Sequence, residues 1–409
     1  MKCSFFLIFL SLFLFRKLFC QVPGCTDPLA GNYNASATQN DGTCIYATAN
    51  YAPVFICNLD SAIFETSGLI FFDGLLWTHN DSGNPNEIYQ VDTVTGIVIH
   101  SVFIRNATNI DWESISQSTT HLFIGNFGNN NGDRINLSIL KIAKTGLVND
   151  TVDAETINFN YPDQINFSPA YNNHNFDCEA FIFANDSLHL FTKNWVDLQT
   201  RHYIIPPDSG TFSAIISDSF FVDGLITDAA INDSGTVILL GYKNIGSGFY
   251  TCFTWLLYDY TGTQYFSGNK RKIEIGNALQ LGQTEGVSFR RGNSGWISSE
   301  TIQAGPISQP AKLHSYNLDS FFSIPLSTGA GYEGIKKKLE IYPTNLNEKL
   351  TILNPDPELF SHFTLFNVLN RVVLSGSLFA GLNLIEVHSL ENGIYFFRSN
   401  SETKKLIKN

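Results

Sequence analysis

Short apolar runs that follow an acidic residue recur along the middle of the chain, and each run has the character of a β-strand. The acids that open these runs are Glu65, Glu113, Glu179, Asp228 and Glu285. Their spacing lies between 48 and 66 residues (113−65 and 179−113). Self-similarity with a period of about 40–50 residues is typical of a β-propeller, in which each repeat forms one blade. The pattern predicts an all-β chain with a propeller of five blades, or of six if the longest interval contains a degenerate blade.

A second pattern accompanies the first, because an apolar run ends in polar residues some 13 to 15 positions after each acid. In an antiparallel pair, the start of the first strand and the end of the second lie at the same edge of the sheet. We therefore expect the acids and these polar side chains to converge at one mouth of the propeller channel. The polar residues expected there are His79, Asn80, Asn126, Lys193, Asn194 and Glu300.

The two ends of the repeat region are expected to meet in one blade. The last repeat has only three strand patterns, at 283–289, 296–300 and 313–318, whereas residues 52–59 form a strand pattern that precedes the first repeat. Giving residues 52–59 to the last blade as its outer strand removes the free sheet edges. The propeller is thus predicted to span residues 49–325.

Composition agrees with an all-β chain and excludes one class of partner. Aromatic residues reach 13%, and β-branched and aromatic residues favour strands. The net charge of −12, with no Lys/Arg patch in the body of the chain, argues against nucleic-acid binding, which needs positive charge against phosphate.

The N-terminus has the features of a secretory signal peptide, predicted at residues 1–20. Lys2 precedes an apolar run from Ser4 to Phe15 that is too short to span a membrane. No other stretch is long and apolar enough for a transmembrane helix. Export permits disulfides, and Cys25 and Cys44 are the expected pair in a small module at residues 21–48. For Cys57, Cys178 and Cys252 the sequence leaves open one pair with a free thiol, or three buried apolar cysteines.

The module between Gly24 and Cys44 is poor in apolar residues, so a disulfide must hold it. Its Gly-Cys-Thr-Asp-Pro start and Asn-Asp-Gly-Thr-Cys end resemble a Cys-bracketed motif of surface proteins from Bacteroidota and, loosely, thrombospondin type 3 repeats. The resemblance implies calcium binding, because hard cations take carboxylate and amide oxygens. The alternative is that the same side chains cap turns and bind nothing. The residues concerned are Asp27, Asn32, Asn34 and Asp41.

The C-terminal part changes character after a predicted linker at residues 326–336. Residues 337–409 contain alternating strands that suit a small antiparallel sandwich. The Leu390–Phe396 run and the basic tail resemble the C-terminal sorting domain (type A) of the type IX secretion system. Thr344–Asn345 and Asn370 depart from that family's pattern but leave the strands intact. The resemblance implies recognition by the type IX machinery and a secreted or outer-cell-surface location.

The repeat region itself resembles a family of exported propellers from Bacteroidota that carries a set of short motifs in a fixed order. This resemblance implies no established reaction. More distantly, the pattern is similar to phytase-like and gluconolactonase-type propellers, in which channel acids and Asn hold a divalent cation. The matching segments are 79–84, 111–113, 125–130, 177–180, 192–195 and 284–286; Asn126 stands where the family has Asp.

The five acids admit three interpretations. They could accept backbone N–H groups from neighbouring blades and lock the ring. They could hold Ca²⁺, with Glu113, Glu179 and Glu285 as the expected ligands and Asn side chains adding neutral oxygens. One acid could act as a general base, aided by the cation and by Lys193 or His79. Catalytic residues cannot be assigned from these patterns.

Other residues on the same face have ordinary alternatives. Lys193 among acids is expected to form an ion pair with a channel glutamate. Trp112 and Trp195 could stack a sugar ring or pack between blades. The loop at 128–133 could bind a cation or form a plain turn.

The function predicted first is that of a secreted or cell-surface binding propeller for a glycan or peptide, with an acidic mouth that holds Ca²⁺. The first alternative is a metal-dependent hydrolase of lactonase or phosphoesterase type that uses the same mouth. The second alternative is a structural or adhesive surface protein. Signatures of other hydrolases, such as Gly-x-Ser-x-Gly and His-Glu-x-x-His, are missing from the sequence, but propeller sites are assembled from separate blades, so their absence does not exclude a hydrolase. An enzyme is the less favoured hypothesis because clustered carboxylates are also common in structural networks.

Overall fold

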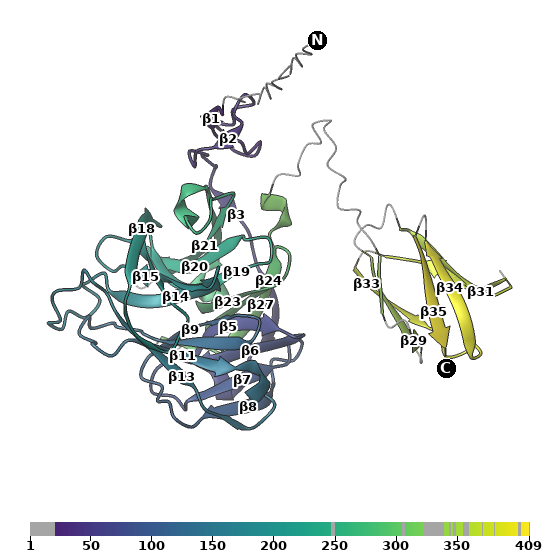
Figure 1. Cartoon of the computed structure of the whole chain (residues 1–409), viewed down its shortest axis with the longest axis horizontal. Coiled ribbons are helices and arrows are strands. Elements are labelled where there is room, and N and C mark those ends of the chain that lie inside the picture. The colour runs from purple at the N-terminus through teal and green to yellow at the C-terminus, as the bar shows by residue number, and fades with distance from the viewer. Residues whose placement is uncertain are drawn as a thin grey trace, which may run out of the picture. The chain divides into compact units, whose positions relative to one another are not determined.

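The computed structural model describes residues 21–246, 250–304, 307–322, 339–342, 345–346, 349–354, 360–369, 371–379, 381–399 and 402–408. The predicted signal peptide (1–20) and linker (326–336) lie outside these residues. The chain divides into two compact units, Met1–Ile324 and Pro325–Asn409. Both are built almost wholly of strands (Figure 1). Among the described residues, no helix combines the length and the hydrophobicity needed to cross a membrane.

In the first unit, the described residues form five sheets of four or five strands. The first sheet contains β5 (Thr66–Phe72), β6 (Leu75–Asn80), β7 (Glu87–Val91), β8 (Val98–Ile104) and β12 (Thr151–Val152). The second contains β9 (Trp112–Gln117), β10 (His121–Asn126), β11 (Ser138–Ala143), β13 (Glu155–Asn160) and β17 (Gly210–Ser213). The third contains β14 (Asp177–Ala184), β15 (Ser187–Lys193), β16 (Gln199–Ile205) and β18 (Ile215–Phe221).

The fourth and fifth sheets both take a strand from before the first repeat. The fourth contains β19 (Leu225–Ile231), β20 (Val237–Asn244), β21 (Tyr250–Tyr258), β22 (Asn269–Asn277) and β3 (Ala49–Asn50). The fifth contains β23 (Gln283–Arg291), β24 (Ser294–Glu300), β27 (Lys312–Asn317) and β4 (Val54–Asn58). The remaining elements are a hairpin of β25 (Ile302–Ala304) and β26 (Ile307–Gln309), the helix α1 (Ala278–Leu281) and the 3-10 turns η1 (Ser61–Ile63), η2 (Lys144–Gly146), η3 (Tyr265–Ser267) and η4 (Asp319–Phe321).

The first strands of the five sheets form a closed ring. β5 contacts β9, β9 contacts β14, β14 contacts β19, β19 contacts β23, and β23 returns to β5. This arrangement confirms the all-β propeller. The long interval between Glu113 and Glu179 contains outer strands of the first two sheets and a loop at 161–176, and its described residues form no further four-stranded sheet.

Side-chain hydrogen bonds connect neighbouring sheets close to the axis. Ser67 Oγ donates to the carbonyl of Glu113 (2.6 Å), and Thr227 Oγ1 donates to the carbonyl of Thr284 (2.9 Å). Each sheet buries its apolar residues against the next, as where Trp77 packs in one cluster with Trp112 of the following sheet. Burial of side chains of this size stabilises a fold by about 1.5–3 kcal/mol each, so packing between sheets holds the ring together.

The ring is closed by the strand that precedes the first repeat. β4 pairs antiparallel with β27, and Leu313 lies opposite Cys57. The expectation that residues 52–59 supply the outer strand of the last sheet is therefore confirmed. Edge pairing of this kind removes backbone donors and acceptors that would otherwise be free.

The small N-terminal module is held by the predicted disulfide between Cys25 and Cys44. Its strands are two residues long, β1 (Pro23–Gly24) and β2 (Gln39–Asn40). The module docks on the fourth sheet, because Asp27 Oδ2 accepts hydrogen bonds from the hydroxyls of Tyr46 (2.7 Å) and Tyr258 (2.8 Å).

The four side chains that the resemblance assigned to calcium make local hydrogen bonds instead. Asp27 Oδ1 accepts from the N–H of Leu29, and Asn34, Asp41 and Asn32 accept from N–H groups of the module in the same way. These hydrogen bonds are the ones that the turn-capping alternative predicts. The cysteines Cys57, Cys178 and Cys252 are free, and the last two are buried.

The second unit is a small sandwich of two sheets around an apolar core. One sheet contains β28 (Glu340–Tyr342), β30 (Lys349–Asn354) and β33 (Gly381–Glu386). The other contains β29 (Asn345–Leu346), β31 (His362–Asn367), β32 (Val372–Ser377), β34 (Gly393–Ser399) and β35 (Glu402–Lys408). The core includes Leu350, Ile352, Leu365, Phe397 and Leu406, all fully buried. This matches the predicted sandwich.

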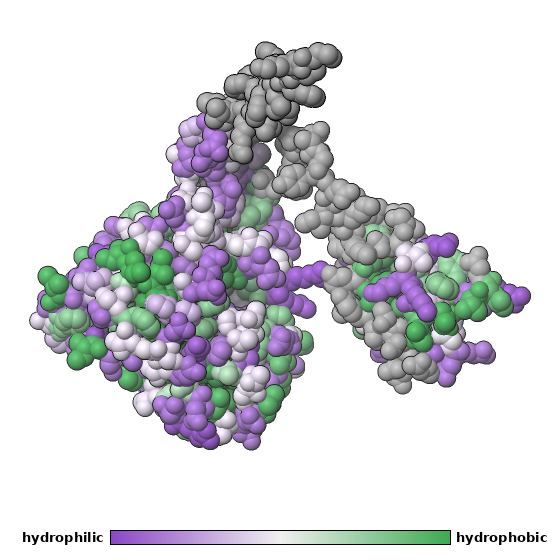
Figure 2. Space-filling view, in the orientation of Figure 1, coloured by the Kyte–Doolittle hydropathy of each residue, from purple (hydrophilic) through white to green (hydrophobic). Residues whose placement is uncertain are grey.

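On the visible face of the first unit, hydrophilic and hydrophobic residues are interspersed (Figure 2).

Candidate functional site

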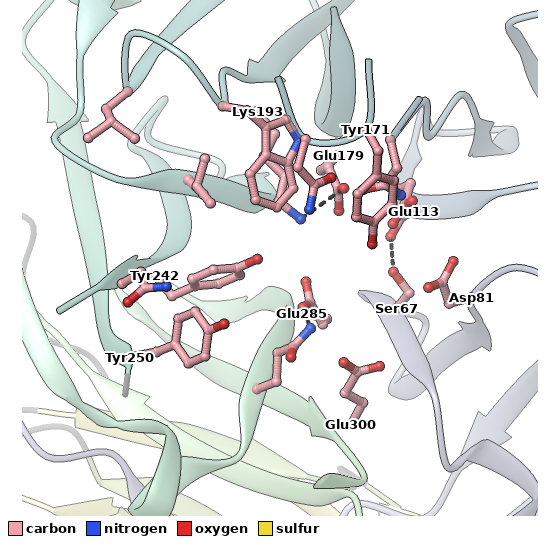
Figure 3. A pocket seen from close by; sticks show the side chains of 17 residues that line it. Ser67, Asp81, Glu113, Tyr171, Glu179, Lys193, Tyr242, Tyr250, Glu285 and Glu300 are labelled. Carbon is pink, nitrogen blue, oxygen red and sulfur yellow. Dashed lines mark hydrogen bonds and ion pairs between the residues drawn. The ribbon is translucent and has the colours of Figure 1, made fainter. Parts of the chain in front are cut away.

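A cavity of about 440 Å³ lies where the inner strands of the propeller end. Carboxyl groups and aromatic rings line it, with Tyr242 and Tyr250 on one side and Tyr171 beside Glu113, and the only basic side chain among the described lining residues is Lys193 (Figure 3). The lining groups that matter for its chemistry are Asp81, Glu113, Glu179, Glu285, Glu300, Trp195, Tyr242, Tyr250 and Lys193. Some of the acids and polar residues that were expected to converge at the channel mouth, although far apart in sequence, thus line one cavity.

β-Bulges place the glutamates in this cavity. The pairing of β14 with β15 skips Glu179, and that of β23 with β24 skips Glu285. The irregularity between β9 and β10 includes Glu113. A bulge leaves its extra residue out of the ladder and re-aims the side chain. Each glutamate can therefore lie at the axis although the rest of its strand alternates normally.

Three carboxyl groups from the first two sheets form a compact group at one side of the cavity. One oxygen each of Asp81, Asp111 and Glu113 lies within 4.8 Å of the others. A Cβ atom at Gly128 would collide with Glu113 Oε1 and lie 2.5 Å from Asp111 Oδ2, so a side chain there would displace both carboxyl groups. The guanidinium Nη1 of Arg134 lies 4.0 Å from Asp111 Oδ2. The group, hereafter the carboxylate triad, has the oxygen chemistry that hard divalent cations prefer.

The electrostatics of the carboxylate triad call for a positive charge. Burial, followed by repulsion from Glu179, Asp81 and Asp111, raises the pKa of Glu113 well above its usual range. Burial and the charge of Asp81 raise the pKa of Asp111 to about 7. Glu113 is 4% exposed, and no described residue donates a hydrogen bond to its carboxylate. A cation bound here would offset the mutual repulsion.

Lys193 is held inside the cavity by an ion pair and two aromatic rings. Its Nζ lies 2.9 Å from Glu179 Oε1, 5.1 Å from the ring centre of Trp195 and 5.4 Å from that of Tyr242. Burial opposes its charge, but Glu179, then Tyr242 and Glu285, raise the pKa of Lys193 well above its usual range. The expected ion pair between Lys193 and a channel glutamate is therefore present.

Glu285 and Glu300 lie on the remaining side of the cavity. Glu285 is 6% exposed and accepts one hydrogen bond, from Gln283 Nε2 to Oε1 (2.7 Å). Burial raises the pKa of Glu285 to about 7. Burial, followed by the charges of Glu285, Asp81 and Glu65, raises the pKa of Glu300 to about 9. At neutral pH, Glu300 therefore keeps its proton unless a positive charge approaches.

Two of the five repeated acids do not line the cavity. Asp228 is fully buried and accepts hydrogen bonds from Ser114 Oγ (2.6 Å) and the N–H of Val287 (2.7 Å), so it connects three inner strands. In β19 the bulge falls on Thr227, one position before Asp228. Glu65 precedes β5 and accepts from Asn84 Nδ2 (2.6 Å). The locking interpretation therefore describes Asp228.

The predicted His and Asn residues serve the surrounding structure. His79 is fully buried edge-on to Trp112, and burial lowers its pKa to about 4, so it is a neutral packing residue. Asn126 Oδ1 accepts from the N–H of Asp111 (3.2 Å), which positions one member of the carboxylate triad. Asn80 Nδ2 donates to the carbonyl of Ala62, and Asn194 Nδ2 donates to Asp197 Oδ1 (both 2.8 Å). None of the four lines the cavity.

Several residues of the cavity and of the carboxylate triad were not singled out from the sequence. Asp81 and Asp111 stood inside the motifs 79–84 and 111–113, but the prediction assigned the site to the glutamates of the repeat. Tyr242 and Tyr250 carried no signal beyond their place near a strand end. Of the two tryptophans, Trp195 lines the cavity, whereas Trp112 is fully buried. In the loop at 128–133, Asn129 N–H donates to Asp177 (2.7 Å), so this loop is fixed by the third sheet.

One family model matches the C-terminal part of the chain. Residues 340–409 match the family described as "Secretion system C-terminal sorting domain". The match confirms the predicted sorting domain and indicates export through the type IX system to the cell surface or the medium. None of the curated proteins matches the chain.

The solved structures found by comparison share little sequence with the chain. A hypothetical protein from Leishmania major has 11% identity, covers 67% of this chain and 93% of its own, and has a TM-score of 0.39. A mutant Bombyx mori β-fructofuranosidase in complex with sucrose has 10% identity, coverage of 88% and 86%, and a TM-score of 0.37. A Phanerochaete chrysosporium exo-β-1,3-galactanase with β-1,3-galactotriose has 10% identity, coverage of 93% and 99%, and a TM-score of 0.38. At these scores the likenesses carry no activity over to this chain.

Proposed function

We propose that the exported chain is an extracellular or cell-surface binding protein that holds its ligand in the axial cavity, with a divalent cation such as Ca²⁺ at the carboxylate triad. The observation that carries the proposal is the cavity itself, in which buried carboxyl groups outnumber the single lysine. In the domain organisation we propose, the signal peptide is 1–20, the module 21–48, the propeller 49–325, the linker 326–336 and the sorting domain 337–409.

The carboxylate triad suits Ca²⁺ better than the three glutamates taken together. Ca²⁺ takes six to eight oxygen ligands at about 2.3–2.6 Å, and Asp81, Asp111 and Glu113 offer neighbouring oxygens. Of the three ligands expected from the sequence, our proposal keeps Glu113. Glu179 is paired with Lys193, and Glu285 accepts from Gln283. Three carboxylates would leave coordination positions for water or for hydroxyls of a ligand.

Calorimetric titration of Ca²⁺ into the full chain tests this proposal. We expect binding that falls at least tenfold in Asp81→Asn and Glu113→Gln, because each removes a charged ligand. Glu274→Gln, an exposed residue of β22, is the matched control and should bind as the native chain does. Absence of Ca²⁺ binding, or binding unchanged in both variants, would remove the cation from the proposal.

A hydrolase of lactonase or phosphoesterase type is a second candidate, and one observation favours it. Glu300, with a pKa raised to about 9 by burial and by Glu285, holds a proton at neutral pH beside the cavity. A carboxylic acid in this state can protonate a leaving group. Lactones and aryl phosphates incubated with the native chain and with Glu300→Gln test this candidate. Turnover that the variant abolishes would support it, and no turnover of either class would leave the binding role.

A purely structural or adhesive role is less well supported. That role would be favoured if the acids were consumed by backbone donors, as Asp228 is. Glu113 instead has no donor among the described residues, and Glu285 has one, from a side chain.

A further inference from the structure

The charges around the axial cavity select against anionic ligands. After Glu179 is matched with Lys193, the carboxyl groups of Asp81, Glu113, Glu285 and Glu300 remain, and no second basic side chain lies among the described lining residues. A phosphate, a sulfate or a uronate would find no basic side chain other than Lys193, which is already paired with Glu179, among the described lining residues. The cavity therefore favours a cationic or a neutral ligand.

Aromatic rings face the carboxyl groups that are not part of the carboxylate triad. Tyr242 and Tyr250 lie edge to face, with ring centres 5.2 Å apart. Figure 3 shows both rings on the side of the cavity opposite Glu300, and Glu285 lies between the rings and Glu300. Carboxylates together with aromatic faces are the groups that bind an ammonium ion, because the ring face carries partial negative charge.

The chain already holds one ammonium group in this manner. Lys193 Nζ is bound by Glu179 Oε1 at 2.9 Å and lies over the rings of Trp195 and Tyr242. Lys193 is 5% exposed. The cavity wall thus stabilises an almost fully desolvated ammonium ion, which is otherwise costly to bury.

The neighbouring pair of carboxyl groups has free hydrogen-bonding capacity. Glu285 is more than nine-tenths buried, lines the cavity and receives its one donor on Oε1. No described residue donates to the carboxyl group of Glu300. Repulsion between Glu285 and Glu300 contributes to the raised pKa of Glu300, and a positive charge placed between them would relieve it.

We infer that the ligand of the axial cavity carries a primary ammonium group, which binds to Glu285, between the rings of Tyr242 and Tyr250 on one side and Glu300 on the other. The inference rests on the proposed function, because it takes the cavity as the ligand site. Such a group occurs on a lysine side chain of a peptide or on an amino sugar. In either source the ammonium donates to both carboxylates while the adjoining carbon chain or sugar ring packs on the tyrosines.

Paired probes that differ only in charge test the inference on the full chain. The peptide pair is Nα-acetyl-lysine amide and its Nε-acetylated form. The sugar pair is glucosamine oligosaccharide and N-acetylglucosamine oligosaccharide. We expect the charged member of at least one pair to bind about tenfold or more tightly than its neutral partner, since a charged hydrogen bond is lost on acetylation. The pair that shows this preference identifies the source of the ammonium group.

Variants locate the site and separate this inference from the proposed function. Glu285→Gln and Glu300→Gln should each weaken binding of the charged probe about tenfold, whereas Glu274→Gln should leave it unchanged. Melting curves check that both cavity variants remain folded. Because Glu300 stands at the end of β24, we expect Glu300→Gln to disturb the fold less than Glu285→Gln does. Equal binding of charged and neutral probes, or full binding by both variants, overturns the inference even if Ca²⁺ binds at the carboxylate triad. Absence of Ca²⁺ binding by the native chain, with binding of the charged probe retained, would instead overturn only the cation.

Discussion

At the scale of single residues, two buried acids that open successive repeats have different roles. Asp228 accepts hydrogen bonds from Ser114 and from the N–H of Val287, and it is fully buried. Glu285 lines the cavity and accepts only from Gln283. A buried carboxylate whose hydrogen bonds are made inside the protein stabilises the fold, whereas one with spare acceptor capacity can bind a ligand. Asp228 is therefore structural, and Glu285 is available for binding.

Replacing Asp228 tests this distinction. Asp228→Ala leaves Ser114 Oγ and the Val287 N–H without an acceptor, and each such loss costs about 1–3 kcal/mol. We expect the free energy of unfolding to fall by about 2–5 kcal/mol in urea denaturation. Glu285→Gln removes a carboxyl group whose pKa is raised to about 7 by burial, so at neutral pH we expect it to raise the free energy of unfolding. Similar stability of Asp228→Ala and the native chain would contradict the structural role.

At the scale of elements, the bulges decide which acids reach the cavity, and this limited the prediction from sequence. Of the residues indicated by the repeat spacing and the strand ends, Glu113, Glu179, Glu285, Lys193 and Glu300 line the cavity. The repeat spacing misplaced Asp228, because in β19 the bulge falls on Thr227 and a shift of one residue turns a side chain to the other face. A bulge depends on the pairing of both strands, which a pattern along one strand does not contain.

The carboxylate triad was harder to predict for a related reason. Asp81 and Asp111 lie in loops at the ends of strands of two different sheets. Asp111 lies two residues before Glu113 at the start of β9, whereas the proximity of Asp81 depends on how the first sheet packs on the second. Gly128 leaves space beside Asp111 and Glu113. The composition of the motifs indicated cation chemistry, but the identity of the ligands required the three-dimensional arrangement.

The N-terminal module is an element whose stability depends on one covalent bond. Its two strands have two residues each and cannot form a core. The disulfide joins cysteines that are 19 positions apart in sequence. A cross-link of this length contributes about 3 kcal/mol by restricting the unfolded chain. We expect the double variant Cys25→Ser, Cys44→Ser to be cleaved within residues 26–44 by limited proteolysis while the propeller stays intact. Cys57→Ala, which removes a free thiol, is the control, and equal protease resistance of all three chains would contradict this account.

At the scale of the whole molecule, the buried titratable groups predict how stability depends on pH. The carboxyl groups of Glu285 and Glu300 have pKa values raised to about 7 and about 9, whereas a glutamate of the unfolded chain has about 4.3. The folded state therefore holds these protons more tightly, and the stability they confer is lost as pH rises through 7 and 9. His79, His189 and His314, with pKa values lowered to about 4, act oppositely and only below about pH 6.5.

Melting temperatures between pH 6.5 and 9.5 test this expectation. Without divalent cations we expect the melting temperature to fall as pH rises over this interval. Glu300→Gln should show a smaller fall, because it lacks the group with the higher pKa. Ca²⁺ should reduce the fall in the native chain if it binds at the carboxylate triad. A melting temperature that rises steadily to pH 9.5 without divalent cations would contradict the assignment.

The pairing of β4 with β27 joins residues that are more than 250 positions apart in sequence (Val54 opposite Ser315). During synthesis or passage through a membrane, the N-terminal strand must wait for its partner until almost the whole repeat region has emerged. Until then the nascent ring has two unpaired borders, which attract other strands. Completion of the propeller is thus tied to arrival of the segment just ahead of the sorting domain. A chain whose synthesis or export stops earlier would have an open propeller with unpaired strand edges, which promotes aggregation.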